Sequence, residues 1–411
     1  MRLLHTSDWH LGQTLHGHDR GWEHQQFLDW LLATLVEHEI DALLVSGDIF
    51  DNANPSAASQ AMLYRFLTAA RGRVAHLNIV LIAGNHDSPG RLEAPAPFLE
   101  EFDARVVGVI GRDAAGEIDL ERLLVPLRDR SGAIAAWCLA VPFLRLSDVP
   151  RLETEGDAYV EGITALYRQV QAHARARRLP GQALIALGHC HMAGGLVSEH
   201  SERRIIVGGA EMLSGTLFDA DIVYAALGHL HLAQKVGGQD RIRYSGSPLP
   251  LSFAEIDYPH QVIKVELEGA ELATVTAIAV PRAVPLLRVP KIAAPLAEVE
   301  AALAALPIDV VEPEAMPYLE VRVLLDQPEP GLRARIEAAL AGKPVRLARI
   351  DTRSTRSEAA ATEPGSLDDL GRLDPLAIFN SAYAAKYGDP PPADLLAAFN
   401  EILNLPDEVA A

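Results

Sequence analysis

Residues 42–51 read ALLVSGDIFD, a nearly uninterrupted apolar run that ends in serine and glycine and is followed by two aspartates. A short run of this kind is typical of a strand that is buried on both faces. Gly47 permits the tight turn that directs the next side chain inward. In an open α/β sheet, ligands bind outside the carboxyl ends of the strands. The pattern therefore predicts a buried strand with a binding site at its carboxyl end, where Asp48 and Asp51 lie.

Similar apolar runs recur along residues 1–280 and alternate with longer helical patterns. We expect buried strands at Leu3–His5, Ala42–Ser46, Ile79–Ala83, Ala135–Val141, Leu184–Leu187 and Ile222–Leu227. Helices are expected at Glu23–His38, Ser56–Ala70 and Asp157–Arg178, where apolar spacing or start signals favour them. This alternation predicts an α/β layered domain.

The sequence changes character near Pro281, where four prolines within fifteen residues predict a linker into a new unit. Residues 281–355 are expected to form a small α+β domain. Its predicted elements are helices at Leu296–Ala305 and Gly331–Ala341 and strands at Tyr318–Leu325 and Val345–Thr352.

The last part of the chain predicts a tether and two short helices. Residues 356–366 are polar and rich in alanine, as flexible linkers are. Residues 367–411 contain two amphipathic stretches, and helices this short are marginal on their own. Their apolar faces therefore need a partner, and the residues expected to meet it are Leu376, Phe379, Leu396 and Phe399.

Charge is spread unevenly over the 411 residues, which suffice for about two to three domains. The net charge of −19 divides into −12 over residues 1–280, 0 over residues 281–350 and −7 over residues 351–411. Such acidity excludes binding of a polyanion over the whole surface. Nucleic acid would have to bind locally, and the best candidate is the small domain with Arg333, Arg335, Lys343, Arg346 and Arg349.

Two cysteines, Cys138 and Cys190, exclude a disulfide framework and fit a reducing cytoplasm. No apolar run approaches the ~18 residues of a membrane-spanning helix. The N-terminus also lacks the apolar core and cleavage site of a signal peptide.

Five motifs with metal-ligand side chains follow the predicted strands. They are Asp8-Trp9-His10, Gly47-Asp48-Ile49-Phe50-Asp51, Gly84-Asn85-His86-Asp87, Gly188-His189-Cys190-His191 and Gly228-His229-Leu230-His231. Each motif alone is weak, but all five can converge on one edge of the sheet. Carboxylate, imidazole and amide oxygen suit Mn²⁺, Fe²⁺ or Zn²⁺. A pair of ions needs a bridging anion, which Asp48 can supply.

The order of these motifs resembles that of the calcineurin-like metallophosphoesterases. Two further stretches resemble the SbcD family of bacterial nuclease subunits, which is related to archaeal and eukaryotic double-strand-break repair nucleases. They are TSDWHLG at residues 6–12 and YSGSPLPLSF at residues 244–253. The resemblance covers the whole chain. It implies a β-sandwich flanked by helices over residues 1–280, a DNA-capping domain at 281–355 and a C-terminal helical pair at 367–411.

The resemblance also implies roles for the site residues. One metal ion would be held by Asp8, His10, Asp48 and His231, and the other by Asp48, Asn85, His189 and His229. His86 would lie beside the scissile phosphate as general acid or stabiliser of developing charge. Asp87 would orient His86.

Three positions depart from the family pattern or add to it. Asp51 stands where archaeal relatives often have histidine, so that histidine's role cannot be transferred. His191 is a second imidazole where one is needed, and we expect it beside the ligands or solvated. Cys190 is expected to be a buried structural thiol.

Other residues near the motifs allow two interpretations. Trp9 can pack in the core below the site or stack on substrate. His16, His18 and Arg20 can contact phosphate or belong to a solvated loop. The run Arg175–Arg178 is best explained by the favourable position of cations at the end of a helix.

The leading hypothesis is a DNA nuclease with two divalent ions, expected to be Mn²⁺. The resemblance implies ATP-dependent 3′→5′ exonuclease action on duplex DNA and endonuclease action on single strands and hairpins, in DNA repair, replication and recombination. ATP hydrolysis would belong to the SbcC ATPase, because the chain lacks a phosphate-binding P-loop motif. SbcC would bind the C-terminal helices. The helix after Pro55 and a helix near Ala94–Phe102 would form a homodimer.

Two alternatives remain open from the sequence. One is a calcineurin-like phosphatase or phosphodiesterase for a small phosphoester, which would share the same site but would not need the extra domain. The other is a metal-free scaffold, against which the intact ligand set argues. A nuclease of this kind is expected in the cytoplasm, at the nucleoid when bound to DNA.

Overall fold

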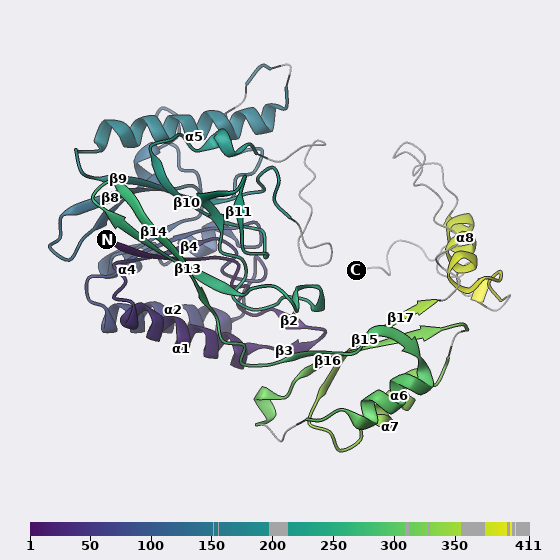
Figure 1. The fold of residues 1–411 in the computed structure, drawn as a ribbon. Coiled ribbons are helices and arrows are strands. Elements are labelled where there is room, and N and C mark those ends of the chain that lie inside the picture. The colour runs from purple at the N-terminus through teal and green to yellow at the C-terminus, as the bar shows by residue number, and fades with distance from the viewer. Residues whose placement is uncertain are drawn as a thin grey trace. The chain divides into compact units, whose positions relative to one another are not determined.

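The computed structural model describes residues 1–150, 152–154, 156–196, 213–308, 312–327, 329–354, 375–392, 395, 396 and 399. The chain divides into two compact units, Met1–Ala283 and Val284–Ala411 (Figure 1). Among the helices of the described part, none is long and apolar enough to cross a membrane.

The first unit is built on two six-stranded sheets. In spatial order, the first sheet contains β14 (Glu271–Ala279), β13 (Gln261–Glu268), β1 (Arg2–Thr6), β4 (Ala42–Ser46), β5 (Asn78–Ile82) and β6 (Ala104–Val107). The second contains β11 (Gln234–Val236), β12 (Gln239–Tyr244), β10 (Ile222–Gly228), β9 (Ala183–His189), β8 (Ile134–Ala140) and β7 (Leu124–Arg128). The central strands are parallel in both sheets, so their carboxyl ends share an edge. A short hairpin, β2 (Thr14–Leu15) and β3 (His18–Asp19), follows the first motif.

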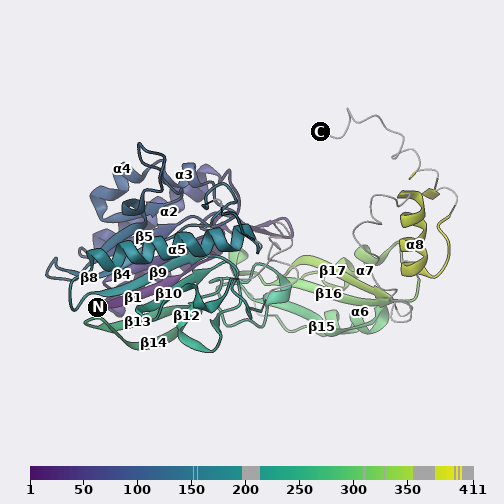
Figure 2. The same ribbon diagram turned by 90° about the horizontal axis from the view of Figure 1, so that it is seen from above.

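Helices cover the outer faces of both sheets, as Figures 1 and 2 show. Two helices, α1 (Gly21–Glu37) and α2 (Ala57–Arg73), lie on one side, and α5 (Ala158–Arg177) lies on the other. The serine that precedes α2, Ser56, accepts a hydrogen bond from the Ser59 N–H, and Asp157 caps α5 in the same way. Two short helices, α3 (Pro89–Glu93) and α4 (Ala96–Leu99), lie between β5 and β6 in the chain.

Alternate residues of the central strands enter two different cores. In β4, Ala42 and Leu44 pack in the core shared with the second sheet, while Leu43 and Val45 pack against α1 and α2. All four are fully buried, and each buried Leu or Val contributes roughly 1.5–3 kcal/mol. Burial on both faces explains why these strands are continuous apolar runs.

The predicted strands and helices of the first unit are all present, with ends shifted by at most three residues. The α/β fold class is therefore confirmed. The hairpin β13–β14 was not predicted. On its outer strand, exposed and half-buried residues alternate without a clear apolar period.

The second unit contains a three-stranded parallel sheet and two helices. The strands are β15 (Leu286–Pro295), β16 (Tyr318–Leu325) and β17 (Arg346–Ser354), and the helices are α6 (Leu296–Ala305) and α7 (Leu332–Ala339). One face of the sheet packs with α6 and α7 around Val299, Leu303 and Ile336.

The proline-rich stretch is not only a linker, because it contains β15. This strand lies at an edge of the sheet, and its pairing with β16 is interrupted between Val289 and Ala294. Proline cannot donate to a sheet ladder and is confined to edges and bulges, which explains how Pro290 is accommodated. The prolines hid the strand from the sequence pattern.

The arginine and lysine residues that are close in sequence do not form one patch. Arg335 pairs with Glu300, Arg333 with Glu337, and Lys343 donates to the Leu306 carbonyl. A different set shares the sheet face opposite α6 and α7. This set consists of Arg288, Arg322, Arg349 and Arg353 together with Glu320 and Asp351.

Of the C-terminal segment, the structure describes α8 (Pro375–Tyr387) and a few residues after it. The α8 ring of Phe379 stacks on that of Phe399, with centroids 4.1 Å apart and an interplanar angle of 11°. The predicted tether at 356–366 and the residues 400–411 lie outside the described residues.

Candidate metal centre

The five strand-end motifs converge at one edge of the two-sheet unit. The first sheet supplies Asp8 and His10 after β1, Asp48 after β4, and Asn85 and His86 after β5. The second sheet supplies His189 at the end of β9 and His229 and His231 after β10. Contacts between the two sets are direct, because His189 Nε2 lies 3.5 Å from Asp48 Oδ2.

The backbone at the ligands adopts a conformation that non-glycine residues rarely take. The φ angles of Asp8, His10 and Asp48 are 54°, 45° and 48°, and that of His229 is 105°. Such residues cost of order 1–3 kcal/mol each and cluster at functional sites. Hydrogen bonds hold the loops in this form, since Asp8 N–H donates to the Gly47 carbonyl (3.0 Å) and His10 N–H to the Asp48 carbonyl (3.0 Å).

One group of ligands consists of Asp8, His10 and His231, whose ligand atoms all lie within 4.8 Å of one another. Asp48 adjoins this group, with its Oδ2 3.6 Å from His10 Nε2. All four side chains are buried. The structure thus brings together the four residues expected to hold the first ion.

A second group surrounds Asn85. Its Oδ1 lies 2.9 Å from His189 Nε2 and 3.0 Å from His229 Nδ1. Asp48 Oδ2 faces the same His189 nitrogen, so this carboxylate lies between the two groups. Its other oxygen accepts the His86 backbone N–H at 2.8 Å. This is the position that a bridging ligand needs.

The residues fit divalent ions. Both ring nitrogens of His10 are buried, and within the described part of the chain neither makes a hydrogen bond. An unpartnered buried polar atom is costly, and a metal ion would supply the missing interaction. Imidazole, carboxylate and amide oxygen donors suit first-row divalent ions, and a dimetal site is the arrangement that the donor set supports.

Neighbouring groups orient the histidine ligands. His189 Nδ1 donates to the Ser46 carbonyl (2.8 Å), and His231 Nδ1 lies 2.8 Å from the carboxylate of buried Glu255. Such hydrogen bonds leave the other ring nitrogen for the ion and strengthen it as a ligand. Glu255 was not predicted as a site residue, because it lies just after the YSGSPLPLSF stretch and carries no motif of its own.

Asp87 supports the loops and does not reach His86. Its buried carboxylate accepts hydrogen bonds from the backbone N–H groups of Ile49 (3.1 Å), Phe50 (2.9 Å) and Gly84 (2.9 Å). Asp87 therefore ties the Asp48 loop to the Asn85 loop. This corrects the expectation that Asp87 orients His86 directly.

Asp51 takes that role through its backbone. The Asp51 carbonyl lies 2.7 Å from His86 Nδ1, and the Asp51 carboxylate lies 3.3 Å from His10 Nδ1. His86 is half-buried, and its ring stands edge-to-face with that of His10 at 4.7 Å. The bond to the carbonyl places a proton on Nδ1 and aims Nε2 elsewhere.

Burial and nearby charges set the protonation of the ligands in the protein without ions. Burial alone would raise the pKa of Asp48, but the imidazoles of His189 and His10 hold that pKa well below its ordinary value. Against the effect of burial, the carboxylates of Asp48 and Asp8 raise the pKa of His189 to about 9. Burial and the charge of His189 lower the pKa of His229 well below its usual range.

Several residues near the site are structural. Trp9 is fully buried and packs edge-to-face with Phe27 and Phe66, which excludes stacking on substrate. Arg20 is buried in an ion pair with Glu23 and does not belong to a solvated loop. The run at the end of α5 is paired with acids, since Arg175 contacts Asp219 and Asp221 and Arg177 contacts Glu121.

The two additional side chains of the β9 motif lie beside the ligands. His191 is half-buried, with its ring 6.1 Å from that of His229. Cys190 is also half-buried, and its Sγ lies 3.8 Å from Met192 Sδ. Burial raises the pKa of the Cys190 thiol to about 12, which keeps it a neutral thiol.

Comparison with known proteins agrees with this site. Residues 1–233 match the calcineurin-like phosphoesterase family, and residues 282–387 match the SbcD_C family, described as the type 5 capsule protein repressor C-terminal domain. The SbcD subunit of the nuclease SbcCD from Rhodobacter capsulatus is 43% identical over 388 residues, which cover 93% of this chain and 94% of that relative.

Two other relatives carry the same name. The SbcD subunit of nuclease SbcCD from Escherichia coli K12 is 31% identical over 93% of each chain. That of Bacillus subtilis is 37% identical over 67% of this chain and 68% of the relative. The chain therefore belongs to the calcineurin-like phosphoesterases and, within them, to the SbcD family of SbcCD nuclease subunits.

Proposed function

We propose that the chain is the DNA nuclease subunit of an SbcCD-type complex, with ATP-dependent 3′→5′ exonuclease activity on duplex ends and endonuclease activity on single strands and hairpins. One observation carries the proposal. A complete dimetal ligand set lies in a chain that matches an SbcD nuclease subunit over 93% of its length, including the second unit. A nuclease of this kind would act in DNA repair, replication and recombination, in the cytoplasm and at the nucleoid.

The metal ions would be held by two sets of residues that share Asp48. The first set is Asp8, His10, Asp48 and His231, and the second is Asp48, Asn85, His189 and His229. Ions bound there would polarise the phosphodiester and lower the pKa of an attacking water. Two Mn²⁺ ions are the form that we expect, since imidazole and carboxylate donors both suit this ion.

His86 would protonate the leaving oxygen. Its Nδ1 proton is held by the Asp51 carbonyl, so a protonated ring presents its second proton at Nε2. The backbone N–H of His86 is bound to the bridging Asp48 carboxylate, which fixes the ring next to the ligands. The half-buried ring can reach a substrate. A general acid in this position contributes about 10²–10⁴-fold to the rate.

DNA contact away from the metal centre would be local. The arginine set on the sheet face of the second unit is a candidate, because four arginines there face two carboxylates. Arg349 and Arg353 are 42% and 64% exposed at the side chain, so both can reach a phosphate. The ion pairs with Glu320 and Asp351 order these side chains before DNA binds.

A homodimer would use the region of α2 and α4. Phe98 is 76% exposed there, and it lines an apolar groove with Tyr64, Leu67, Pro95 and Leu99. An exposed ring of this size beside a groove is typical of a protein interface. Mass measurement in solution tests this, and a monomer at micromolar concentration that stays monomeric with SbcC would contradict it.

SbcC would bind the C-terminal helices. The stacked pair Phe379 and Phe399 supports a helical pair in this segment, and the predicted contacts are Leu376, Phe379, Leu396 and Phe399. A chain that ends at Ala361 should keep its metal centre and lose affinity for SbcC. Full affinity of the shortened chain would contradict this assignment.

The decisive experiment compares DNA with a small phosphoester. Purified full-length chain, with and without SbcC and ATP, is given Mn²⁺ and either a DNA hairpin or a nucleotide monophosphate. We expect cleavage of the hairpin, stimulated by SbcC and ATP. Strong turnover of the monoester without hairpin cleavage would favour a phosphatase instead, and no Mn²⁺-dependent cleavage of either would contradict the proposal.

A further inference from the structure

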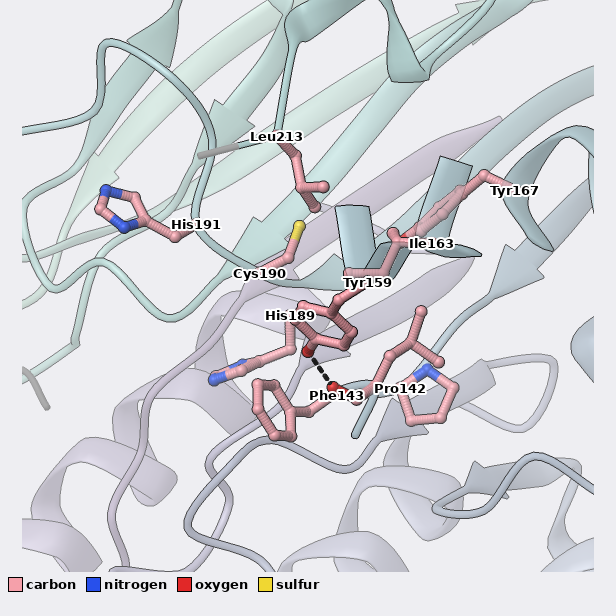
Figure 3. Close-up of a pocket in the computed structure, with 10 residues that line it drawn as sticks. Pro142, Phe143, Tyr159, Ile163, Tyr167, His189, Cys190, His191 and Leu213 are labelled. Atoms are coloured by element: carbon pink, nitrogen blue, oxygen red, sulfur yellow. Dashed lines mark hydrogen bonds between the residues drawn. The ribbon is translucent and has the colours of Figure 1, made fainter. Parts of the chain in front are cut away.

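A pocket adjoins the metal centre on the side of His189. Its walls come from the segment after β8, the first half of α5 and the end of β9 (Figure 3). The lining residues are Pro142, Phe143, Leu144, Tyr159, Ile163, Tyr167, His189, Cys190, His191 and Leu213. Most of these side chains are apolar or aromatic, whereas the metal centre beside them is made of carboxylates and imidazoles. His189 belongs to both, so the two sites share a wall.

Phe143 stands at the boundary between the pocket and the metal centre. Its ring packs edge-to-face against that of His189, with centroids 6.2 Å apart and an interplanar angle of 84°. The Phe143 backbone N–H donates to the Ala83 carbonyl at 2.8 Å, which holds the segment against the Asn85 loop. The ring is only half-buried. The end of β8 thus supplies no metal ligand but places an accessible aromatic side chain beside the ligands.

Polar groups also line the pocket. The Tyr159 hydroxyl donates to the Leu144 carbonyl at 2.5 Å (Figure 3). Tyr167 is only 1% exposed, and in the described part of the chain its hydroxyl makes no hydrogen bond. A Cβ at Gly188 would lie 2.6 Å from this hydroxyl, so glycine is needed there. An unpartnered buried hydroxyl in an apolar pocket is a group that a ligand can bind.

We propose that this pocket binds the base of the nucleotide whose phosphate lies at the metal centre. The inference rests on the proposed nuclease function and adds a substrate subsite to it. A flat heterocycle presents a π-face to an aromatic side chain and polar edges to a hydroxyl, and the pocket offers both. A base is linked to its phosphate through one sugar, and the shared wall at His189 places pocket and metal centre next to each other.

The first test measures nucleotide binding, which does not depend on DNA cleavage. Titration calorimetry compares dTMP with deoxyribose 5-phosphate on the full chain loaded with Mn²⁺. We expect wild type to bind dTMP about tenfold more tightly, the gain typical of one stacked base. Phe143→Ala should remove this preference and leave the affinity for the sugar phosphate unchanged, and Phe143→Tyr should retain it.

A matched control comes from the same segment. Leu146 is 59% exposed and does not line the pocket, so Leu146→Ala should leave the preference for dTMP intact. Equal binding of dTMP and deoxyribose 5-phosphate by wild type would overturn the inference. A preference that survives Phe143→Ala would overturn the role of Phe143.

The second test uses DNA and separates this inference from the proposed function. Full chain with SbcC, ATP and Mn²⁺ cleaves an oligonucleotide with either a normal or an abasic nucleotide at the scissile position. We expect the abasic site to raise KM about tenfold in wild type and to have no effect in Phe143→Ala. Equal KM values in wild type would overturn the subsite, whereas the absence of any cleavage would contradict the nuclease function instead.

Discussion

The two sheets of the first unit bring different chemistry to the same site. Every carboxylate around the ligands except that of Glu255 follows a strand of the first sheet: Asp8, Asp48, Asp51 and Asp87. The second sheet contributes imidazoles, those of His189, His229 and His231. The carboxylates raise the pKa of His189 and the imidazoles lower that of Asp48. The site is therefore complete only when the two sheets pack on each other, and each half makes the other tolerable as a buried charge.

The largest effect should come from removing the carboxylate that both halves share. Asp48→Ala takes away the group that faces His10 and His189 at 3.6 and 3.5 Å. We expect loss of both ions and a fall in nuclease activity of at least about 10³-fold, the scale of lost metal chemistry. Metal analysis and hairpin cleavage measure this. Exposed Asp29 on α1 provides the control, and Asp29→Ala should change neither quantity.

His86 separates catalysis from metal binding. His86→Gln should lower kcat about 10²–10⁴-fold because the general acid is lost, while the metal content stays at the wild-type value. The backbone N–H that binds Asp48 is retained in this variant. A parallel loss of metal would show that His86 is a ligand, and unchanged kcat would exclude it as the acid.

On the imidazole side, Glu255 should matter less. Glu255→Gln weakens the hydrogen bond to His231 Nδ1 and removes a buried negative charge. Loss of such a partner typically costs about 10–100-fold in metal affinity, and we expect this range for Mn²⁺ by titration calorimetry. Glu37→Gln, at an exposed position of α1, is the matched control. Wild-type affinity in Glu255→Gln would contradict the role assigned to Glu255.

The charge coupling between the sheets predicts a pH dependence. The pKa of His189 is raised to about 9 without ions, so this ring is protonated at neutral pH and must lose its proton to bind a metal. Mn²⁺ affinity should rise about tenfold per pH unit up to about pH 9, because binding releases one proton. Calorimetry at pH 7 in buffers of different ionisation enthalpy counts that proton. An affinity independent of pH between 6 and 8 would contradict the coupling.

Sequence patterns predicted the ligands well because each follows a buried strand. Continuous apolar runs such as Ala42–Ser46 are unambiguous, and parallel strands bring their carboxyl ends to one edge. What the sequence could not supply was contact between distant side chains. Glu255 lies in a short turn with no periodic pattern, and its contact with His231 follows from the tertiary fold alone.

Two other failures have physical causes. The strand β15 was hidden because its prolines are tolerated only at a sheet edge and an interruption of pairing. The basic cluster of the second unit was misjudged because closeness in sequence does not place side chains on one face. Arg335 and Arg349 belong to different surfaces, since one pairs with Glu300 of α6 and the other with Glu320 of β16.

The most direct test of the joint site is the number of Mn²⁺ ions bound per chain. Full-length protein is stripped of metal, equilibrated with Mn²⁺ and analysed by elemental analysis beside calorimetry. We predict two ions per wild-type chain and none in Asp48→Ala, since both ligand sets share that carboxylate. One ion or fewer in wild type, or two ions in Asp48→Ala, would contradict a dimetal centre built jointly by the two sheets.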